Sequence, residues 1–295
     1  MEKRKRKGTI IKDNYSKKCS AKINLFLEVI AKRTDGFHEL RSLFGELSLA
    51  DDILFKLTEN PQVKISCTSN HIPNGENLVL KIVRYLKKTY RIEKGLEIIL
   101  KKNIPISAGL GGGSSDAAQT ILACNELWKL DFSYEKMNKI ALKFGSDISY
   151  FLQGGTSCVF GRGEIVKPIS NRFEIKNILL VNPNIHISSR DAYSWMDIKK
   201  EKTDKFKKIT QAFLDKDFNM LSENLFNSLE PGVFAHYPVI EKIKNKLIKF
   251  GATGSLMSGS GSTVFGIFDS IPKINMAKSY FNNLKYWTKI SSLQT

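Results

Sequence analysis

The chain has 295 residues, of which 42% are hydrophobic, and a formal net charge of +17 at pH 7. This length allows one large domain or two ordinary ones, and no apolar run approaches the ~20 residues that a membrane helix needs. The basic N-terminus lacks the apolar stretch of a secretory signal peptide, so we expect a cytoplasmic protein with no membrane segment.

The positive charge does not by itself indicate specific nucleic-acid binding. Much of the excess lies in residues 1–18, and the remainder is scattered along the chain and is mostly Lys. Specific recognition favours clustered Arg side chains. We therefore expect no specific nucleic acid partner, although a basic surface can attract anionic substrates.

The hydrophobic pattern of the first half predicts an α+β arrangement. Residues 1–18 have the composition of a basic disordered tail. The tail is followed by predicted strands over 23–29, 46–57 and 62–67, a helix over 78–86, and a strand over 96–100. The last strand leads into a glycine-rich loop, and a helix is predicted from residue 117 to about residue 128.

The second half continues with a predicted helix over 134–144 and a strand pair over 156–160 and 164–169. A polar stretch near residues 170–176 predicts a boundary, so the expected domains are 19–172 and 173–295. The predicted elements of the second domain are a strand over 178–181, helices over 207–214, 218–227 and 239–250, strands over 255–257 and 263–268, and a final helix and strand.

Neither the cysteines nor the histidines have the spacing of metal ligands. The cysteines are Cys19, Cys67, Cys124 and Cys158, and the histidines are His38, His71, His186 and His236. We expect ordinary reduced thiols and no zinc site.

The most informative segment is the glycine-rich loop and helix start over 105–118. Its glycines, Gly109, Gly111, Gly112 and Gly113, fall between a predicted strand and an Ala-rich helix. Glycines permit positive φ and close approach of a ligand, while a helix start offers unpaired N–H groups and a positive dipole end. The combination predicts a phosphate site, and a flexible surface loop is the alternative.

The loop matches neither of two common nucleotide motifs. It is not a Walker A sequence, because no Lys follows Gly113. It is not a dinucleotide fingerprint, because Ser114 stands where the third Gly should be.

Three further segments carry candidate site residues. Lys22 and Asn24 stand two apart on a predicted strand and so share one face, although a half-exposed edge strand would show the same pattern. Asp147 lies at a predicted helix start, where a carboxylate is either an N-cap or a general base. Gly259 and Ser260 lie between two predicted strands, where small residues form a tight turn or admit a ligand close to the backbone.

Taken together and in this order, the segments resemble the GHMP kinases. The likeness runs from about residue 20 to residue 268 and depends on segments 21–28, 35–44, 105–118, 145–151 and 257–263. The resemblance implies a two-domain fold, with an N-terminal α+β ATP-binding domain and a ferredoxin-like C-terminal α/β sandwich domain. It also implies ATP as phosphoryl donor and Mg²⁺ as cofactor, with the protein ligands of the metal unassigned.

The pattern is most similar to the branch of this family whose substrate is cytidylyl methylerythritol. It implies phosphorylation of the 2-hydroxyl group of that compound, in the non-mevalonate route to isoprenoid precursors. Lys22 and Asp147 match the catalytic pair: Asp147 would take the hydroxyl proton, and Lys22 would orient that carboxylate and stabilise developing charge.

The resemblance also assigns binding residues. Those assigned to ATP are Asn77 and the loop residues Pro105, Ile106, Ser107, Ala108, Gly109, Leu110, Gly111, Gly112, Gly113, Ser114 and Ser115. Those assigned to the substrate are Asn24, Phe37, His38, Tyr193, Gly259 and Ser260.

Phe37 and Tyr193 are expected to flank the cytosine, while the two ring nitrogens of His38 suit its edge. The family more often has Tyr where this chain has Phe37, so the stacking face is kept and a hydroxyl is lost. Two alternatives remain: another small-molecule kinase of the family, or a basic nucleotide- or RNA-binding protein that has lost catalysis. The sequence leaves the oligomeric state open, a homodimer included.

Overall fold

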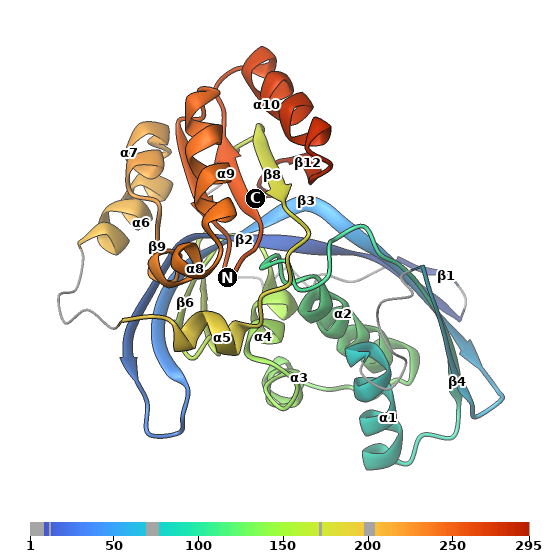
Figure 1. Cartoon of the computed structure of the whole chain (residues 1–295). Coiled ribbons are helices and arrows are strands. Elements are labelled where there is room, and N and C mark those ends of the chain that lie inside the picture. Colours follow the sequence, from blue (N-terminus) through green and yellow to red (C-terminus); the bar gives the residue numbers. More distant parts are fainter. Residues whose placement is uncertain (1–8, 12, 69–76, 171–172, 198–203, 295) are drawn as a thin grey trace. The chain divides into compact units, whose positions relative to one another are not determined.

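The structure is a computed structural model that describes residues 9–11, 13–68, 77–170, 173–197 and 204–294 (Figure 1). The chain forms two compact units, each assembled from three stretches. Unit 1 comprises Met1–Ala21, Ala50–Ile104 and Gly112–Gln153, and unit 2 comprises Lys22–Leu49, Pro105–Gly111 and Gly154–Thr295. The units therefore do not follow the sequential division expected at residue 172, and residues 171–172 lie outside the described part of the chain.

Two long strands contribute residues to both units. They are β2 (Asn14–Lys32) and β3 (His38–Thr58), of 19 and 21 residues. β3 agrees with the strand predicted over 46–57 but begins earlier, because its first half pairs with a strand from the second half of the chain.

Unit 1 places helices against a mixed sheet. Its other strands are β1 (Thr9–Ile11), β4 (Val63–Cys67) and β5 (Gly95–Lys101), with β5 antiparallel to β3 and parallel to β4. Its helices are α1 (Leu78–Tyr90), α2 (Gly112–Leu127), α3 (Tyr134–Ala141) and α4 (Ser146–Gln153). α2 packs against α1, α3 and α4 and is buried on most sides, which suits its small Ala, Ser and Gly residues.

The N-terminal segment differs from the expected disordered tail. Residues 1–8 and 12 lie outside the described part, but β1 pairs with β2 in the register Thr9↔Ser16. Tyr15 is fully buried, with its ring centroid 6.3 Å from that of Phe55. The Lys-rich composition concealed a strand whose inward side chain contributes to the core of unit 1.

Unit 2 contains strands that extend the long pair and a separate antiparallel sheet. β6 (Ser157–Gly161) pairs with β3, β7 (Ile165–Pro168) with β6, and β9 (Phe226–Asn227) in parallel with β2. The separate sheet has the order β10–β11–β8–β12. Its strands are β8 (Ile178–Asn182), β10 (Gly254–Met257), β11 (Val264–Ile267) and β12 (Trp287–Ser291).

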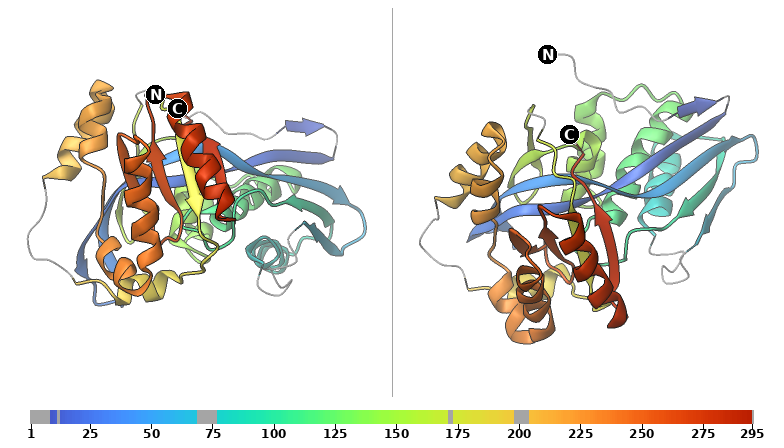
Figure 2. Two further views of the ribbon diagram at one scale, coloured as in Figure 1. Left: turned by 45° about the horizontal axis from the view of Figure 1, so that its top comes forward. Right: turned by 90° about the horizontal axis from the view of Figure 1, so that it is seen from above.

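Helices α9 (Pro238–Lys249) and α10 (Ile271–Asn283) pack on this second sheet, as Figure 2 shows. The chain order β8, α9, β10, β11, α10, β12, together with the strand order, confirms the expected ferredoxin-like arrangement. The remaining helices of unit 2 are α5 (Ser189–Ser194), α6 (Lys205–Asp215), α7 (Phe218–Glu223) and α8 (Glu230–His236). The helix predicted over 218–227 ends early, because residues 226–227 pair with β2. Within the described residues, no helix is both long and apolar enough to cross a membrane.

Candidate active site

The glycine-rich loop runs into α2, which begins at Gly112 rather than at residue 117 as expected. Gly109 and Gly111 have φ values of 74° and 70°, in the region that favours glycine. Gly112, Gly113, Ser114 and Ser115 form the first turn of α2 in unit 1, whereas Pro105, Ile106, Ser107, Ala108, Gly109, Leu110 and Gly111 belong to unit 2. The predicted phosphate-binding residues thus include a helix start with unpaired N–H groups.

Gly109 lies directly against the turn that carries Gly259. A Cβ atom at Gly109 would be only 2.0 Å from the carbonyl oxygen of Ser258. The hydroxyl of Ser258 donates a hydrogen bond to the carbonyl oxygen of Gly109 at 2.9 Å. A side chain at Gly109 would therefore push apart two segments that the sequence singled out separately.

Lys22 and Asn24 are both buried, which excludes the half-exposed edge strand. The Lys22 ammonium donates to Asn24 Oδ1 at 2.6 Å, and Asn24 Nδ2 donates to Ser42 Oγ at 3.0 Å. The ammonium also lies 4.8 Å from the centroid of the Phe44 ring. The backbone N–H of Lys22 donates to Leu110 O at 2.9 Å, which joins β2 to the glycine loop.

The turn at Gly259 faces this pair. A Cβ atom at Gly259 would be 3.2 Å from Lys22 Nζ and 3.4 Å from Asn24 Oδ1. Ser260 Oγ lies 3.3 Å from Ser189 Oγ, at the start of α5, the helix that carries Tyr193. Unit 2 therefore brings together Lys22, Asn24 and the turn at Gly259; the catalytic role of Lys22 and the substrate-binding roles of Asn24, Gly259 and Ser260 stay predictions.

Asn227 supports the turn at Gly259 through hydrogen bonds to its backbone, a role that no sequence motif had indicated. Its Nδ2 donates to the carbonyl oxygens of Met257 and Gly259, both at 2.8 Å, and its Oδ1 accepts from the Leu229 N–H at 2.9 Å. Glu230 adds a second support by accepting from the Met257 N–H at 2.9 Å. Burial raises the pKa of Glu230, and Lys244 opposes that shift.

Phe37, His38 and Tyr193, the residues expected to bind the cytosine base, all lie in unit 2. His38 and Tyr193 contact each other, which the sequence did not predict. The rings of His38 and Tyr193 stack with centroids 4.9 Å apart and planes at 25°. Phe37 is 49% exposed, and its ring lies 4.8 Å from the guanidinium carbon of Arg162. Burial, with a smaller effect of Lys32, lowers the pKa of His38, which favours the neutral ring with one donor and one acceptor.

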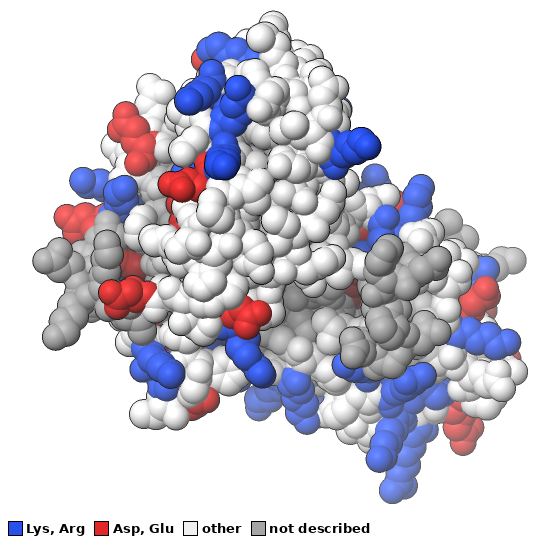
Figure 3. Space-filling model, viewed as in Figure 1, with Lys and Arg blue, Asp and Glu red and all other residues white. Residues whose placement is uncertain are grey.

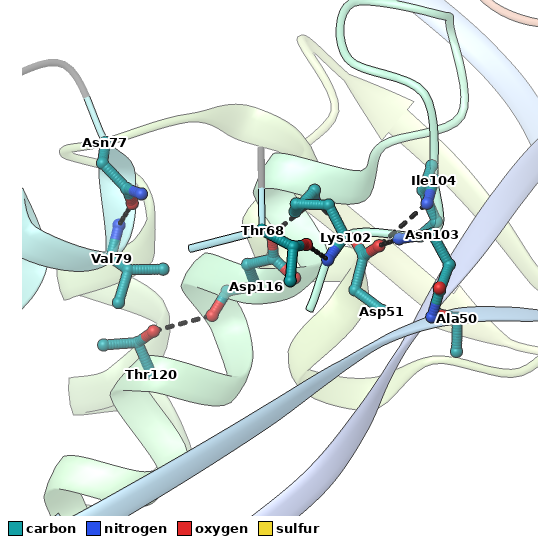
Figure 4. A network of polar contacts seen from close by, with 10 residues as sticks. All are labelled: Ala50, Asp51, Thr68, Asn77, Val79, Lys102, Asn103, Ile104, Asp116 and Thr120. Atoms are coloured by element: carbon teal, nitrogen blue, oxygen red, sulfur yellow. Dashed lines mark hydrogen bonds and ion pairs between the residues drawn. The ribbon is translucent and has the colours of Figure 1, made fainter. Parts of the chain in front are cut away.

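Two further predicted residues, Asp147 and Asn77, also lie in unit 1. Asp147 lies in the first turn of α4, which begins at Ser146, so Asp147 is not the N-cap. The helix dipole favours a carboxylate at this position. Asn77 is the N-cap of α1 and accepts from the Val79 N–H at 2.9 Å (Figure 4). Its cap role was not anticipated, and its contact with ATP stays a prediction.

The described residues offer no group of three or more His, Cys, Asp and Glu side chains that could hold a metal ion. The described part of the chain thus offers no protein cage for Mg²⁺, which more often keeps waters and binds substrate phosphates. Cys19, Cys67, Cys124 and Cys158 are free thiols, as expected.

Comparison with known proteins identifies the class. The description "GHMP kinases N terminal domain" matches residues 77–155, and "GHMP kinases C terminal" matches residues 209–282. The chain belongs to the GHMP kinase family.

Particular relatives are similar over almost the whole chain. The 4-diphosphocytidyl-2-C-methyl-D-erythritol kinase of Thermoanaerobacter pseudethanolicus is 41% identical over 88% of this chain and 89% of its own. The protein of the same name from Thermodesulfovibrio yellowstonii is 40% identical over 92% and 95%. A crystal structure of 4-(cytidine 5'-diphospho)-2C-methyl-D-erythritol kinase matches with a TM-score of 0.79 and 28% identity, over 95% of this chain and all of that one.

Proposed function

We propose that this protein transfers the γ-phosphoryl group of ATP to the 2-hydroxyl of 4-diphosphocytidyl-2-C-methyl-D-erythritol. The observation that carries the proposal is the buried Lys22–Asn24 pair beside the backbones of Gly109 and Gly259. The near full-length similarity to relatives of that name supports this choice of substrate. Such an enzyme would act in the cytoplasm on a small molecule.

In this proposal the loop residues from Pro105 to Ser115 bind the phosphates of ATP through backbone N–H groups, and Asn77 lies near the adenosine. Asp147 accepts the proton of the substrate hydroxyl. Lys22 stabilises negative charge on the transferred group, with its ammonium held in place by Asn24. A bound Mg²⁺ would supply charge neutralisation on the phosphates.

The cytidine end of the substrate would bind at Phe37, His38 and Tyr193. Since His38 and Tyr193 stack with centroids 4.9 Å apart, a base cannot lie between them as they stand. We infer that the base stacks on the exposed ring of Phe37 and takes a hydrogen bond from His38, with Tyr193 supporting the imidazole. Ser260 and Gly259 would lie near the transferred group.

Turnover by the purified protein tests this proposal. ATP consumption should require the cytidylyl substrate, and ³¹P NMR should show a new phosphomonoester at its 2-hydroxyl. Equal turnover with mevalonate, galactose or homoserine would refute the assignment of substrate.

The face drawn in Figure 3 gives limited support to a nucleic-acid-binding protein without catalysis. Lys and Arg side chains gather at its lower right and are elsewhere interspersed with acidic and uncharged residues. RNA binding with a steep salt dependence and no phosphoryl transfer would support that alternative instead.

A further inference from the structure

A buried cluster of charges in unit 1 consists of Asp51, Lys102 and Asp116, hereafter the Lys102 cluster (Figure 4). The Lys102 ammonium donates to Asp51 Oδ2 and, at 2.7 Å, to Asp116 Oδ2. The three side chains are at most 7% exposed. Asp116 lies within the glycine-rich segment 105–118, but the sequence had assigned no role to any of these three residues.

The cluster joins the two chain segments that flank the glycine loop. Lys102 follows the last residue of β5, and Asp51 also accepts from the N–H groups of Asn103 at 2.5 Å and Ile104 at 2.8 Å. Ile104 is the last residue before the loop. Asp116 belongs to α2, which begins immediately after the loop. One ammonium therefore connects the segment that enters the loop with the helix that leaves it.

The close fit around the loop's exit supports a positional role. A Cβ atom at Gly112 would be 3.0 Å from Ile104 Cγ2 and 3.4 Å from Asp51 Oδ2. The residues before and after the loop thus touch at the point where the Lys102 cluster holds them. Small changes in this spacing would be passed directly to the N–H groups at the start of α2.

The charges of the cluster do not balance when both carboxyl groups are ionised. One ammonium faces two buried carboxylates, and burial of an unpaired charge is costly. Asp51 receives three hydrogen bonds, from Lys102 and from the N–H groups of Asn103 and Ile104. Burial raises the pKa of Asp116 to about 7 against the opposing effect of Lys102. The thiol of Cys19, whose pKa is raised by burial and then by Asp116, borders the same carboxyl group.

A role in stability alone gives no reason for this composition. Well-packed apolar side chains often replace a buried ion pair without loss of stability. What the cluster provides beyond stability is a fixed geometry. One ammonium bonded to two carboxyl oxygens sets the distance between the two chain segments that carry them.

We propose that Lys102 is a positioning residue for nucleotide binding: by linking Asp51 to Asp116, it sets the spacing of the two flanks of the glycine loop. The ligand is then an anionic polyphosphate bound by the N–H groups of the loop. This inference rests on the proposed function only for the identity of that ligand.

The test compares Lys102→Met with the double variant Lys102→Met/Asp116→Asn. The single variant leaves two buried carboxyl groups without their cation and should melt at a lower temperature. The double variant removes the surplus carboxyl and should regain most of the melting temperature. Because the link is absent in both variants, both should bind ATP about ten- to a hundredfold more weakly, the reach of a lost charge-assisted hydrogen bond.

Isothermal titration with ATP and Mg²⁺ measures this affinity without any turnover. Lys94→Met is the matched control, since Lys94 is an exposed lysine of unit 1 that pairs with Glu59 at 2.8 Å. It should bind ATP as the wild type does. In steady-state assays the KM for ATP should rise in the two Lys102 variants, while the KM for the acceptor substrate stays constant.

Two results would overturn the inference: wild-type ATP affinity in Lys102→Met, or recovery of affinity together with melting temperature in the double variant. The second result would mean that Lys102 only compensates charge. Failure of the proposed function gives a different pattern, in which the wild type binds ATP but does not phosphorylate the cytidylyl compound.

Discussion

The support that Asn227 gives to the Gly259 turn leads to a sharp prediction for Asn227→Asp. The substitution preserves the shape of the side chain and the acceptor for the Leu229 N–H. It replaces the Nδ2 donor with an oxygen that faces the carbonyl oxygens of Met257 and Gly259, each 2.8 Å away in the wild type. The two hydrogen bonds are lost, and the new carboxylate oxygen repels the carbonyl oxygens of Met257 and Gly259.

The magnitude follows from the burial of this site. Asn227 is 2% exposed, so water does not replace the lost donors. Each lost hydrogen bond costs about 1 kcal/mol, and the repulsion among buried oxygens adds a similar amount, for a total of about 3 kcal/mol. For a chain of this size, that corresponds to a melting temperature lower by about 5 °C. The new carboxyl should favour its protonated form, so the loss should shrink as pH falls.

Asn224→Asp is the control, measured by the same thermal unfolding and steady-state assays. Asn224 is also buried, but its Nδ2 makes one hydrogen bond, to Met220 O at 2.7 Å, away from the turn. We expect a loss of about 1 kcal/mol and an unchanged kcat. Asn227→Asp should lower kcat at least tenfold, since the turn lies against Lys22 and misplacement of a reacting group by about 1 Å can cost a hundredfold. Equal losses of stability, or a wild-type kcat in Asn227→Asp, would refute the reasoning.

Three other predictions follow from the site. Asp147→Asn should lower kcat by about 10²–10⁴-fold in steady-state assays, the usual range of acid–base catalysis, whereas a near-normal rate would remove Asp147 as the base. His38→Ala should raise the KM for the cytidylyl substrate and leave ATP binding unchanged in titration calorimetry; a fall in ATP affinity would contradict the placement of the base. The pKa of Asp116, about 7, lies above its ordinary 3.8, so its stabilising effect is complete below about pH 4 and is lost as pH rises through 7. Between pH 5 and pH 8, the free energy of unfolding of Asp116→Asn, measured with denaturant, should rise by about 2–3 kcal/mol relative to that of the wild type. If the free energies of unfolding of the two proteins changed with pH in parallel, the prediction would be wrong.

The local part of the site could be predicted from the sequence. The period of two along a strand placed Lys22 and Asn24 on one face, and the glycines before an Ala-rich segment indicated a helix start that binds anions. These features depend on neighbouring residues only. The ferredoxin-like domain, by contrast, was expected only from the resemblance to the GHMP kinases and not from any single segment.

The remainder depends on pairings between distant segments. The burial of Lys22 requires the turn near Gly259, and the stacking of His38 on Tyr193 joins residues more than 150 positions apart. Asn227 and Lys102 have no motif, because their partners are backbone groups or single carboxyl groups elsewhere in the chain. The strand predicted over 23–29 lies within β2, but β1 and the start of β2 were missed, because Lys side chains at 17 and 18 disguise a strand that buries Tyr15.

The division of the chain into interleaved stretches has a consequence for synthesis on the ribosome. Every stretch of unit 1 has been made once Gln153 is added, so this unit can close while the rest is still being translated. The stretch Lys22–Leu49, whose strand residues are mostly buried in the finished protein, must wait for residues 154–295. During that interval its apolar side chains lack their final neighbours, so we expect the nascent chain to bind chaperones.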